Sequence, residues 1–336
     1  MKIAMVMAGN EEGGLEKHVE ELVAGLADRG HEVTWVAHPK YADRVRGSAR
    51  FEAVDLARSR RNPLALWALW RALKSLQPDV IHSHGGKALA MVSSLRIWLN
   101  AAMITTIHGQ KKRHTGITTM DAAILPSHHL AGAIHSRQVH VIYHGIRQPV
   151  STPIVSTRAN LDALADKPLW LAVGRLVKEK GFDILVAAMT GAPGTLWIAG
   201  DGPERGSLER QIARLGLEDR VILLGYRSDV PALMKQCHCL VISSRREGFS
   251  YVFAEALFNR CPVISTDVPI PNEVLPPNLI CPTEDATALA KLMNSFKPDS
   301  ELVDSLADFA DSHLTLDSMV DGTLEVYEQL LAGSAR

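Results

Sequence analysis

The sequence predicts an α/β protein built from two doubly wound parallel sheets. Short apolar runs alternate with amphipathic helical patterns along the 336-residue chain, which is the order expected of parallel strands joined by helical crossovers. The pattern occurs once in the first half of the chain and again in the second half. Between the halves, residues 148–167 are rich in Pro, Ser and Thr and weakly periodic, which indicates a linker.

In the first half, residues 2–8 (KIAMVMA) form an apolar run that fits a buried strand and is too short for the apolar core of a signal peptide. Residues 15–30 follow with apolar positions at helical spacing. Residues 31–37, 79–84 and 103–109 predict the next strands, with helices between them.

The second half repeats this order. Five apolar runs predict strands, at residues 168–175, 195–200, 221–225, 239–244 and 262–266. Residues 206–216 and 250–259 predict two of the helices between them. Because ligands of such sheets bind outside the carboxyl ends of the strands, the residues that directly follow a strand are the candidates for a site.

Charge is distributed unevenly along the chain. Residues 1–150 carry 19 Lys and Arg against 12 Asp and Glu, a net charge of +7, whereas residues 151–336 carry 17 against 25, a net charge of −8. This asymmetry suggests two modules with different partners. Chance variation of surface charge is the alternative.

The four cysteines show no CxxC spacing, which indicates reduced thiols and a cytoplasmic protein. The sequence contains no apolar run of 18 residues, so no membrane-spanning helix is expected.

Glycine and cationic residues follow two strands at positions suited to a diphosphate. Gly13 and Gly14 stand between the first strand and its helix, where backbone can approach a ligand and free helix N–H groups favour an anion. A plain tight turn is an equally open interpretation. Arg175 ends the predicted strand at 168–175 and Lys180 lies five positions further on, so the two together suit a diphosphate, with solvated surface cations as the alternative.

The segment SRREGFSYVFAEAL places two glutamates in an apolar frame. Glu247 lies in a turn after the strand at 239–244, and Glu255 lies about a turn and a half into the next helix. Carboxylates accept from hydroxyl donors, so this pair suggests a polyhydroxylated ligand. The alternatives are a salt bridge from Glu247 to Arg245 or Arg246 and a solvated helix face for Glu255.

The start of that helix predicts an anion site. Four residues there can offer backbone N–H groups, namely Gly248, Phe249, Ser250 and Tyr251. Tyr226 and Arg227, which follow the strand at 221–225, are placed to hold a nucleobase edge by backbone hydrogen bonds and stacking.

Histidines end two strands of the first half. His108 precedes Gly109 and is expected to face the cleft, which makes it the histidine favoured for function. His82 and His84 have a spacing that occurs in metal sites, but no third ligand has a convincing spacing, so no metal site is predicted.

Five segments together resemble the GT-B fold retaining glycosyltransferases of family 4. They occur in the order of that family and read GGLEKHVEELVAGLADRGHEV, VGRLVKEKGFD, AGDGPERGSLE, LGYRSDV and EGFSYVFAEAL. The resemblance implies two Rossmann-like domains that face a central cleft, an acceptor-binding domain over residues 1–150 and a nucleotide-sugar-binding domain over residues 151–317. It also implies a helix within residues 318–336 that packs back on the first domain.

The resemblance implies roles for the residues of the second domain. The E-x7-E motif of the family falls on Glu247 and Glu255, which implies contacts to the donor sugar hydroxyls and to the ribose, respectively. Arg175 and Lys180 match the diphosphate pair of the family. Further matches concern the phosphates and the base: Ser250 and Tyr251 would join the phosphate site through their backbone, and Tyr226 and Arg227 would flank the base.

In the first domain, Gly14 matches the glycine near the phosphates, and His108 matches a cleft histidine close to the donor sugar. Two segments depart from the family pattern. His144 in YHGI replaces the usual Asn, and residues 268–272 (VPIPN) replace the usual glycines beside the donor.

The resemblance implies a retaining transfer from a nucleotide-diphosphate sugar, with a UDP-sugar as the first choice, to a saccharide or lipid-linked acceptor. His108, Arg175, Lys180 and Glu247 would carry the catalysis, and no metal or other cofactor would be needed. Lipopolysaccharide or surface polysaccharide assembly is the expected setting, and nucleic acid is not an expected partner. A nucleotide-sugar epimerase and an inactive nucleotide-binding scaffold stay open as alternatives.

Two basic segments of the first half, residues 57–76 and 109–116, suggest contact with anionic lipid on the inner face of the membrane or with a lipid-linked saccharide. The other interpretation is that Leu64, Trp67, Leu69 and Leu73 pack on the sheet and the arginines are solvated. Core packing is favoured for most of this helix, and membrane contact stays open for the basic loops.

Overall fold

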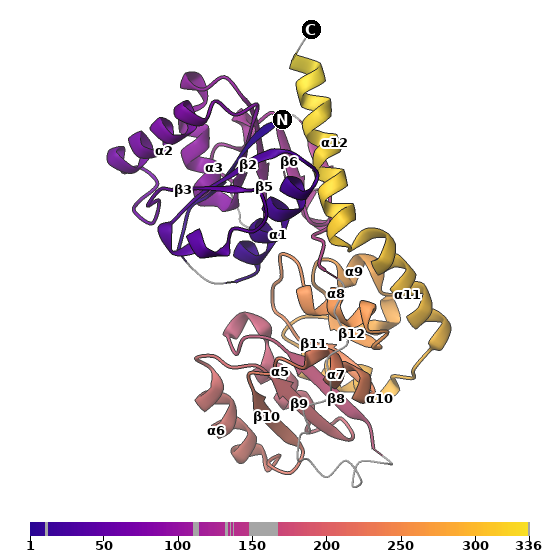
Figure 1. Ribbon diagram of the computed structural model, residues 1–336. Helices are drawn as coiled ribbons and strands as arrows, with labels where there is room; N and C mark the ends of the chain where they lie inside the picture. The colour runs from indigo at the N-terminus through magenta and orange to yellow at the C-terminus, as the bar shows by residue number, and fades with distance from the viewer. Residues whose placement is uncertain are drawn as a thin grey trace. The chain divides into compact units, whose positions relative to one another are not determined.

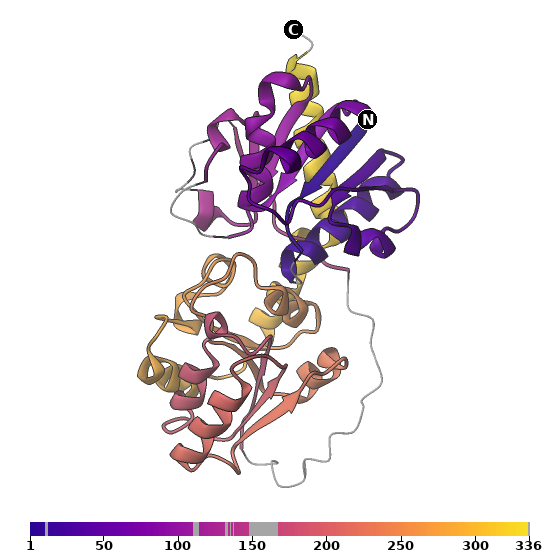
Figure 2. The same cartoon turned by 90° about the vertical axis from the view of Figure 1, so that its left-hand side faces the viewer.

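The computed structural model describes residues 1–10, 13–109, 114–131, 134, 136, 138–147 and 167–334. They fall into two compact units (Figures 1 and 2). Unit 1 consists of Met1–Ile146 and His313–Arg336, and unit 2 of Arg147–Ser312. The predicted linker lies outside the described residues except for Lys167, and so do residues 110–113 of the basic segment 109–116.

Unit 1 is built on a parallel sheet whose described strands have the order β3-β2-β1-β4-β5-β6-β7. They are β1 (Lys2–Met7), β2 (Glu32–Ala37), β3 (Arg50–Ala53), β4 (Val80–His84), β5 (Ala102–Thr106), β6 (Ala122–Leu125) and β7 (Val139–Val141). The order reverses where β1 pairs with β4. A reversal of this kind opens a crevice at the carboxyl ends of the two strands.

Helices cover both faces of this sheet (Figure 1). The helical elements are α1 (Gly14–Asp28), α2 (Pro63–Leu76), α3 (Gly85–Ser94), α4 (His128–Ala131), α12 (Leu316–Ser334) and the 3₁₀ segments η1 (Pro39–Arg44), η2 (Arg96–Trp98) and η3 (Ile117–Thr119). Side chains of α2 and α3 share one apolar core with the sheet, and those of α1 and α12 share the other. The buried apolar area of both faces stabilises the unit.

The last helix, α12, is distant in sequence but packs along α1 within unit 1 (Figure 1). The contact is close because Gly25 has no side chain: a Cβ atom there would lie 2.5 Å from Cγ2 of Val320. Arg29 adds ion pairs to Asp317 at 2.8 Å and to Asp321 at 2.9 Å.

Unit 2 is built on a second parallel sheet, with strand order β10-β9-β8-β11-β12-β13 among the described residues. The strands are β8 (Leu169–Val173), β9 (Thr195–Ala199), β10 (Val221–Gly225), β11 (Cys239–Ile242), β12 (Val263–Thr266) and β13 (Ile280–Cys281). The helical elements are η5 (Lys178–Lys180), α5 (Phe182–Ala188), α6 (Arg205–Leu215), α7 (Val230–Gln236), α8 (Tyr251–Phe258), α9 (Pro271–Val274), η6 (Pro277–Leu279), α10 (Ala286–Ser295) and α11 (Ser300–His313). Its sheet reverses order between β8 and β11, as that of unit 1 does between β1 and β4.

The predicted fold class is confirmed, since each unit is a parallel sheet with helical crossovers. The prediction missed β3, β6, β7 and β13. They are short, between two and four residues, so they are too brief to show a periodicity of their own, and β3 (RFEA) carries two charges. Pairing with a longer neighbour makes such segments strands.

All four cysteines are free, and Cys237 is half-buried while Cys239, Cys261 and Cys281 are buried. Among the helices of the described residues, none combines the length and the apolar character needed to cross a bilayer.

Candidate active site

Three loops meet at the carboxyl edge of the unit 2 sheet. The β8–α5 loop is tied to the β9–α6 loop because the N–H of Leu176 donates to the carbonyl of Asp201 at 2.8 Å. It is tied to the β11–α8 loop because the N–H of Arg245 donates to the carbonyl of Glu179 at 2.8 Å. Backbone hydrogen bonds thus hold the predicted diphosphate loop against the loop that carries Glu247.

Gly181 makes this close approach possible. Its φ of +64° lies in the left-handed region, and a Cβ atom would lie 2.1 Å from the carbonyl oxygen of Ser243. The hydroxyl of Ser243 donates to the carbonyl of Lys180 at 2.9 Å. The glycine in VKEKG therefore places Lys180 directly beside the start of the β11–α8 loop.

Lys180 and Glu247 form an ion pair. Nζ of Lys180 lies 2.6 Å from Oε1 of Glu247, whose side chain is 8% exposed. The hydroxyl of Ser244 donates to the same oxygen at 2.6 Å. The alternative of a salt bridge from Glu247 to Arg245 or Arg246 is not found among the described residues. The carboxylate is instead fixed by the residue predicted to meet the diphosphate.

Arg245 braces the loop from outside. Its guanidinium donates to both carboxylate oxygens of Asp183, at 2.6 and 2.7 Å, and to Glu284 at 2.6 Å. The hydrogen bond from Arg245 holds the pKa of the Asp183 carboxyl below its usual value, against the opposing effect of burial. Arg246 lies 3.5 Å from Glu179. Both arginines of SRRE thus have structural partners.

The start of α8 offers backbone N–H groups. Ser250 is the N-cap residue, fully buried and with extended backbone, and its side chain does not cap the helix. The first N–H groups of a helix have no intrahelical partner. Gly248 and Phe249 precede the cap, and Tyr251 is the first helical residue. The residues predicted to offer N–H groups to an anion therefore lie at the start of α8, as the sequence places them.

Glu255 lies on the second turn of α8. It is half-buried, and its neighbours Phe253, Ala254, Ala256 and Leu257 are buried. A fully solvated face is therefore not its environment.

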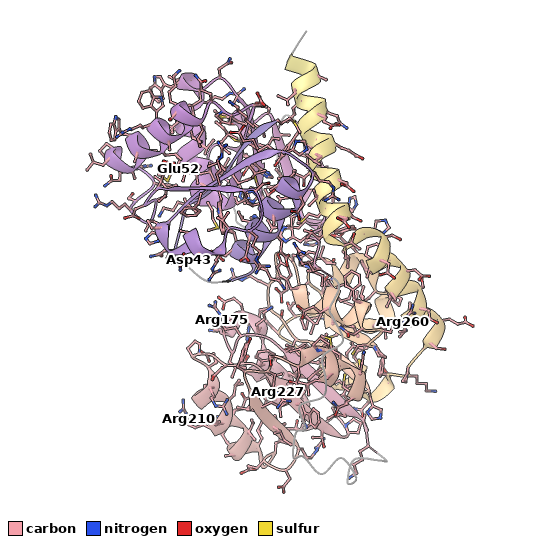
Figure 3. The ribbon with its side chains drawn as sticks, viewed as in Figure 1. Asp43, Glu52, Arg175, Arg210, Arg227 and Arg260 are labelled. Atoms are coloured by element: carbon pink, nitrogen blue, oxygen red, sulfur yellow. The ribbon has the colours of Figure 1, made fainter. Side chains whose placement is uncertain are left out.

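The remaining predicted residues of unit 2 differ in their surroundings. Arg175 is exposed on the β8–α5 loop (Figure 3). Tyr226 is 81% exposed, which leaves its ring face open to a stacking partner. Arg227, also labelled in Figure 3, donates from Nε to Asp229 at 2.7 Å and from Nη2 at 2.5 Å. The side chain of Asp229 is 4% exposed, so it fixes the guanidinium of Arg227.

Unit 1 has a cavity of about 510 Å³ at the carboxyl ends of β1, β4 and β5. Its lining includes Gly9, Glu16, His84, Lys87 and His108. Gly13 is the N-cap residue of α1 and Gly14 is its first residue, so both stand between two lining stretches of the chain. The reversal between β1 and β4 accounts for the position of the cavity.

Five histidines gather beside this cavity. They are His18 on α1, His82 and His84 on β4, His108 after β5 and His144 after β7. The ring centroid of His18 lies 4.8 Å from that of His108 and 4.1 Å from that of His144. Sequence reasoning singles out His108 and notes His82 and His84. It misses His18, and the only signal for His144 is the replacement of the usual Asn.

Two hydrogen-bond groups order these rings. His82 contacts the hydroxyl of Tyr327 on α12 through Nδ1 at 2.6 Å and the hydroxyl of Thr106 through Nε2 at 2.7 Å. Nδ1 of His84 lies 3.3 Å from Nε2 of His108.

Burial lowers the pKa of His82 and of His108 to about 3. Burial, with the neighbouring imidazoles as a second cause, lowers the pKa of His18, His84 and His144 well below the usual value. These side chains are therefore neutral at pH 7. His108 can give or accept a hydrogen bond there, but it brings no positive charge to a ligand.

Two doubly wound units with loops gathered at the carboxyl ends of their strands are the architecture of the GT-B glycosyltransferases. Family models agree: residues 156–313 match the glycosyl transferases group 1 and residues 12–148 match glycosyltransferase family 4. The chain belongs to this GT-B glycosyltransferase family.

Two curated relatives come from Rhizobium meliloti. The chain is 27% identical to the lipopolysaccharide core biosynthesis glycosyltransferase LpsE, with 99% of each chain covered. It is 28% identical to the lipopolysaccharide core biosynthesis glycosyltransferase LpsD, with 91% of each covered. Among solved structures, Anabaena HepE in complex with UDP has the same fold, with a TM-score of 0.81, 19% identity and coverage of 98% of this chain and 100% of that chain.

Proposed function

We propose that this glycosyltransferase moves a sugar, with retention, from a UDP-sugar to a saccharide or glycolipid acceptor in lipopolysaccharide or surface polysaccharide assembly. The observation that carries the proposal is the pair Lys180–Glu247 at the loop that leads into α8. This pair places the ammonium of Lys180 and a carboxylate that can accept hydrogen bonds from hydroxyl groups in the loop before the N-terminus of α8. Two relatives named for lipopolysaccharide core biosynthesis and a structural neighbour in complex with UDP support the choice of pathway and donor.

Within unit 2, the donor would be held along its length. Arg175, Lys180 and the backbone N–H groups at Gly248 to Tyr251 would receive the diphosphate. Glu255 would accept from the ribose hydroxyls. The exposed ring of Tyr226 would stack on the base, with Arg227 held at its side by Asp229.

Roles for three residues of unit 1 rest on the family pattern. His108 would contact the donor sugar as a neutral hydrogen-bonding group, and Gly13 and Gly14 would let the backbone approach the phosphates. The cavity that His108 lines is the proposed acceptor site in this unit.

The reaction would depend on leaving-group departure. As the bond from the anomeric carbon to the diphosphate oxygen breaks, Lys180 and Arg175 would stabilise the charge that develops on that oxygen. The sugar would become oxocarbenium-like, with Glu247 accepting from its hydroxyls. The acceptor hydroxyl would attack the same face and pass its proton to the departing phosphate oxygen. No metal is assigned to this step.

The proposed location of the protein is the cytoplasmic face of an anionic membrane, which it would contact peripherally. The core-packing alternative is correct for Leu69 and Leu73, which are buried, but wrong for Leu64 and Trp67, which are 65% and 55% exposed. The Arg71 guanidinium lies 5.5 Å from the Trp67 ring centroid. Apolar side chains among arginines are typical of a surface that meets anionic lipid. Co-sedimentation with phosphatidylglycerol vesicles is expected, and Trp67→Ala should weaken it.

The test of the function is a binding screen of UDP-, GDP- and ADP-sugars by thermal shift, followed by transfer assays with the labelled donor that binds best. A lipopolysaccharide core extract supplies acceptors. The proposal expects the label in an acceptor with the anomeric configuration of the donor. Conversion of the free donor to an epimer would favour the epimerase alternative, and binding without turnover would favour an inactive scaffold.

A further inference from the structure

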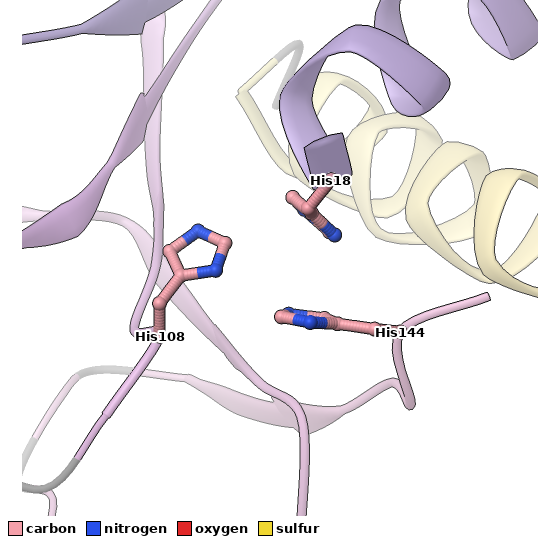
Figure 4. Close-up of side chains that lie close together, drawn as sticks. All are labelled: His18, His108 and His144. Carbon is pink, nitrogen blue, oxygen red and sulfur yellow. The ribbon is translucent and has the colours of Figure 1, made fainter. Parts of the chain in front are cut away.

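Three histidines of unit 1 converge, of which His18 and His144 are buried and His108 is half-buried. His18, His108 and His144 can each offer one ring nitrogen such that the three atoms lie within 4.8 Å of one another. Figure 4 shows the three rings around a common space, each from a different segment of the chain. The sequence contains no convincing third ligand spacing because these residues are separated by 36 to 126 positions.

Ring nitrogens of two of these histidines, His18 and His108, lack hydrogen-bond partners among the described residues. Among the described residues, neither nitrogen of His18 has a hydrogen-bond partner, and the same holds for Nδ1 of His108. His18 is 3% exposed. A buried polar atom without a partner costs free energy, and such atoms in a folded protein point to a bound water or ion.

We propose that His18, His108 and His144 form a binding site for one divalent transition-metal ion of the zinc class. Three imidazole ligands with a fourth position for water or another oxygen ligand are a known arrangement for Zn²⁺. Imidazole also suits Cu²⁺ and Ni²⁺, whereas Mg²⁺ and Ca²⁺ prefer oxygen ligands. The ligand chemistry therefore favours the zinc class over the hard cations.

The three ring nitrogens would have to move closer together when the ion binds, since they lie within 4.8 Å of one another without it. Zinc–nitrogen bonds of about 2.1 Å at tetrahedral angles place the nitrogens roughly 3.4 Å apart. Rotation of the three rings toward the common space would supply the difference.

The contact between His84 and His108 indicates which ring nitrogen of His108 would bind the ion. Nε2 of His108 is engaged with Nδ1 of His84 at 3.3 Å, while its Nδ1 has no partner among the described residues. Ligand histidines usually donate through the second ring nitrogen to a partner that fixes their orientation. Nδ1 of His108 is accordingly the ligand, and His84 is the outer partner.

The ion would have a path from solvent. His108 and His84 also line the 510 Å³ cavity of unit 1, together with Glu16 and Lys87. A His108 ring with Nδ1 on the ion and Nε2 on His84 has no nitrogen left for the donor sugar, so metal binding and that contact exclude each other. The site still goes beyond the proposed function, since the cations assigned to leaving-group departure belong to unit 2. Metal binding can therefore be tested with no sugar donor present, and its failure would leave the proposed transfer untouched.

The experiment uses the full chain, purified without a histidine tag and freed of metal with a chelator. Zn²⁺ is titrated in competition with a chromogenic chelator, and Co²⁺ is followed by its visible absorption. We expect one equivalent of Zn²⁺ with a Kd on the order of 1 μM or tighter, and the intense bands of Co²⁺ with four or five ligands.

Single-ligand variants decide the assignment. His18→Ala and His144→Ala should weaken Zn²⁺ binding by roughly 100-fold or more, because even an outer-shell partner is worth about 10- to 100-fold. The exposed His129→Ala is the matched control and should bind as the parent does. The site would be overturned if all variants bound Zn²⁺ with the affinity of the parent. It would also be overturned if the parent itself bound no Zn²⁺ in the titration.

His18→Gln provides a second variant that keeps a polar side chain if the alanine variants unfold. Thermal unfolding gives an independent readout, because a ligand that binds only the folded state raises Tm. Zn²⁺ should raise the Tm of the parent and of His129→Ala but not that of His18→Gln. A rise of the same size in His18→Gln would place the ion elsewhere.

Discussion

Nζ of Lys180 lies 2.6 Å from Oε1 of Glu247, although 67 positions separate them in the chain. Lys180 ends η5 after β8, and Glu247 follows β11, so the pair joins the loops of two neighbouring strands. Each residue is predicted as a ligand contact from its own motif. Their contact means that, in the proposed reaction, one cation serves both to hold the carboxylate and to meet the diphosphate.

Lys180→Met tests this pair. Loss of the ammonium removes charge stabilisation at the leaving group and leaves the Glu247 carboxylate without its ion partner, so kcat should fall by roughly 10²–10³-fold. The measurement is steady-state transfer with the donor found by the screen, with the exposed neighbour Lys178→Met as control. Near-normal turnover of Lys180→Met would show that the diphosphate is bound elsewhere.

Glu255→Ala tests the ribose assignment. A hydrogen bond to a charged acceptor contributes about 1.5–3 kcal/mol, so the Kd for UDP should rise by roughly tenfold or more. Isothermal calorimetry with UDP measures this, and the exposed Glu218→Ala is the control. If both variants bind UDP as the parent does, Glu255 does not contact the nucleotide.

Acid should destabilise unit 1 through His82. Its pKa is about 3 when folded and about 6.5 when unfolded. The folded state therefore binds fewer protons, and the free energy of unfolding falls as the pH drops below about 6.5, by up to about 1.4 kcal/mol per pH unit. The stability that His82 contributes is fully present only above that pH.

Urea unfolding between pH 7 and pH 4.5, in the presence of a chelator, measures this slope. The pKa values of the other histidines of this group are also lowered, so the slope of the parent protein is the sum of their contributions and that of His82. His82→Gln keeps an amide for Tyr327 but cannot titrate, and its slope should be shallower. If the slope of His82→Gln equalled that of the parent, the pKa of His82 would not be lowered in the folded state.

Gly25→Ala tests the packing of α12 on α1. The new methyl group would lie 2.5 Å from Cγ2 of Val320, so overpacking should cost about 1–3 kcal/mol. Thermal unfolding measures the loss. Gly333→Ala is the control, since a Cβ atom at Gly333 of α12 would meet no heavy atom within 4 Å and alanine favours a helix. Val320→Ala should restore part of the loss, whereas an additive double variant would contradict the contact.

Much of the site could be predicted because its parts are local. A strand followed by glycine and cations, or by a turn and a helix, is written in consecutive residues, and the sequence places the start of α8 at Ser250, within one residue of its observed start. Asp229 is not expected beside Arg227 from the sequence, although it stands only two positions away. Its burial, which makes it the partner, depends on the surrounding fold.

The sequence by itself determined the fold class, the two parallel sheets and the loops that carry Arg175, Lys180, Glu247 and Glu255. These follow from periodicity and turn chemistry, which act over a few residues. The tertiary structure alone decided that Lys180 binds Glu247 and that His18, His108 and His144 converge. Such contacts depend on strand order and on crossovers that bring distant segments to one sheet edge, and no local pattern records where those segments meet.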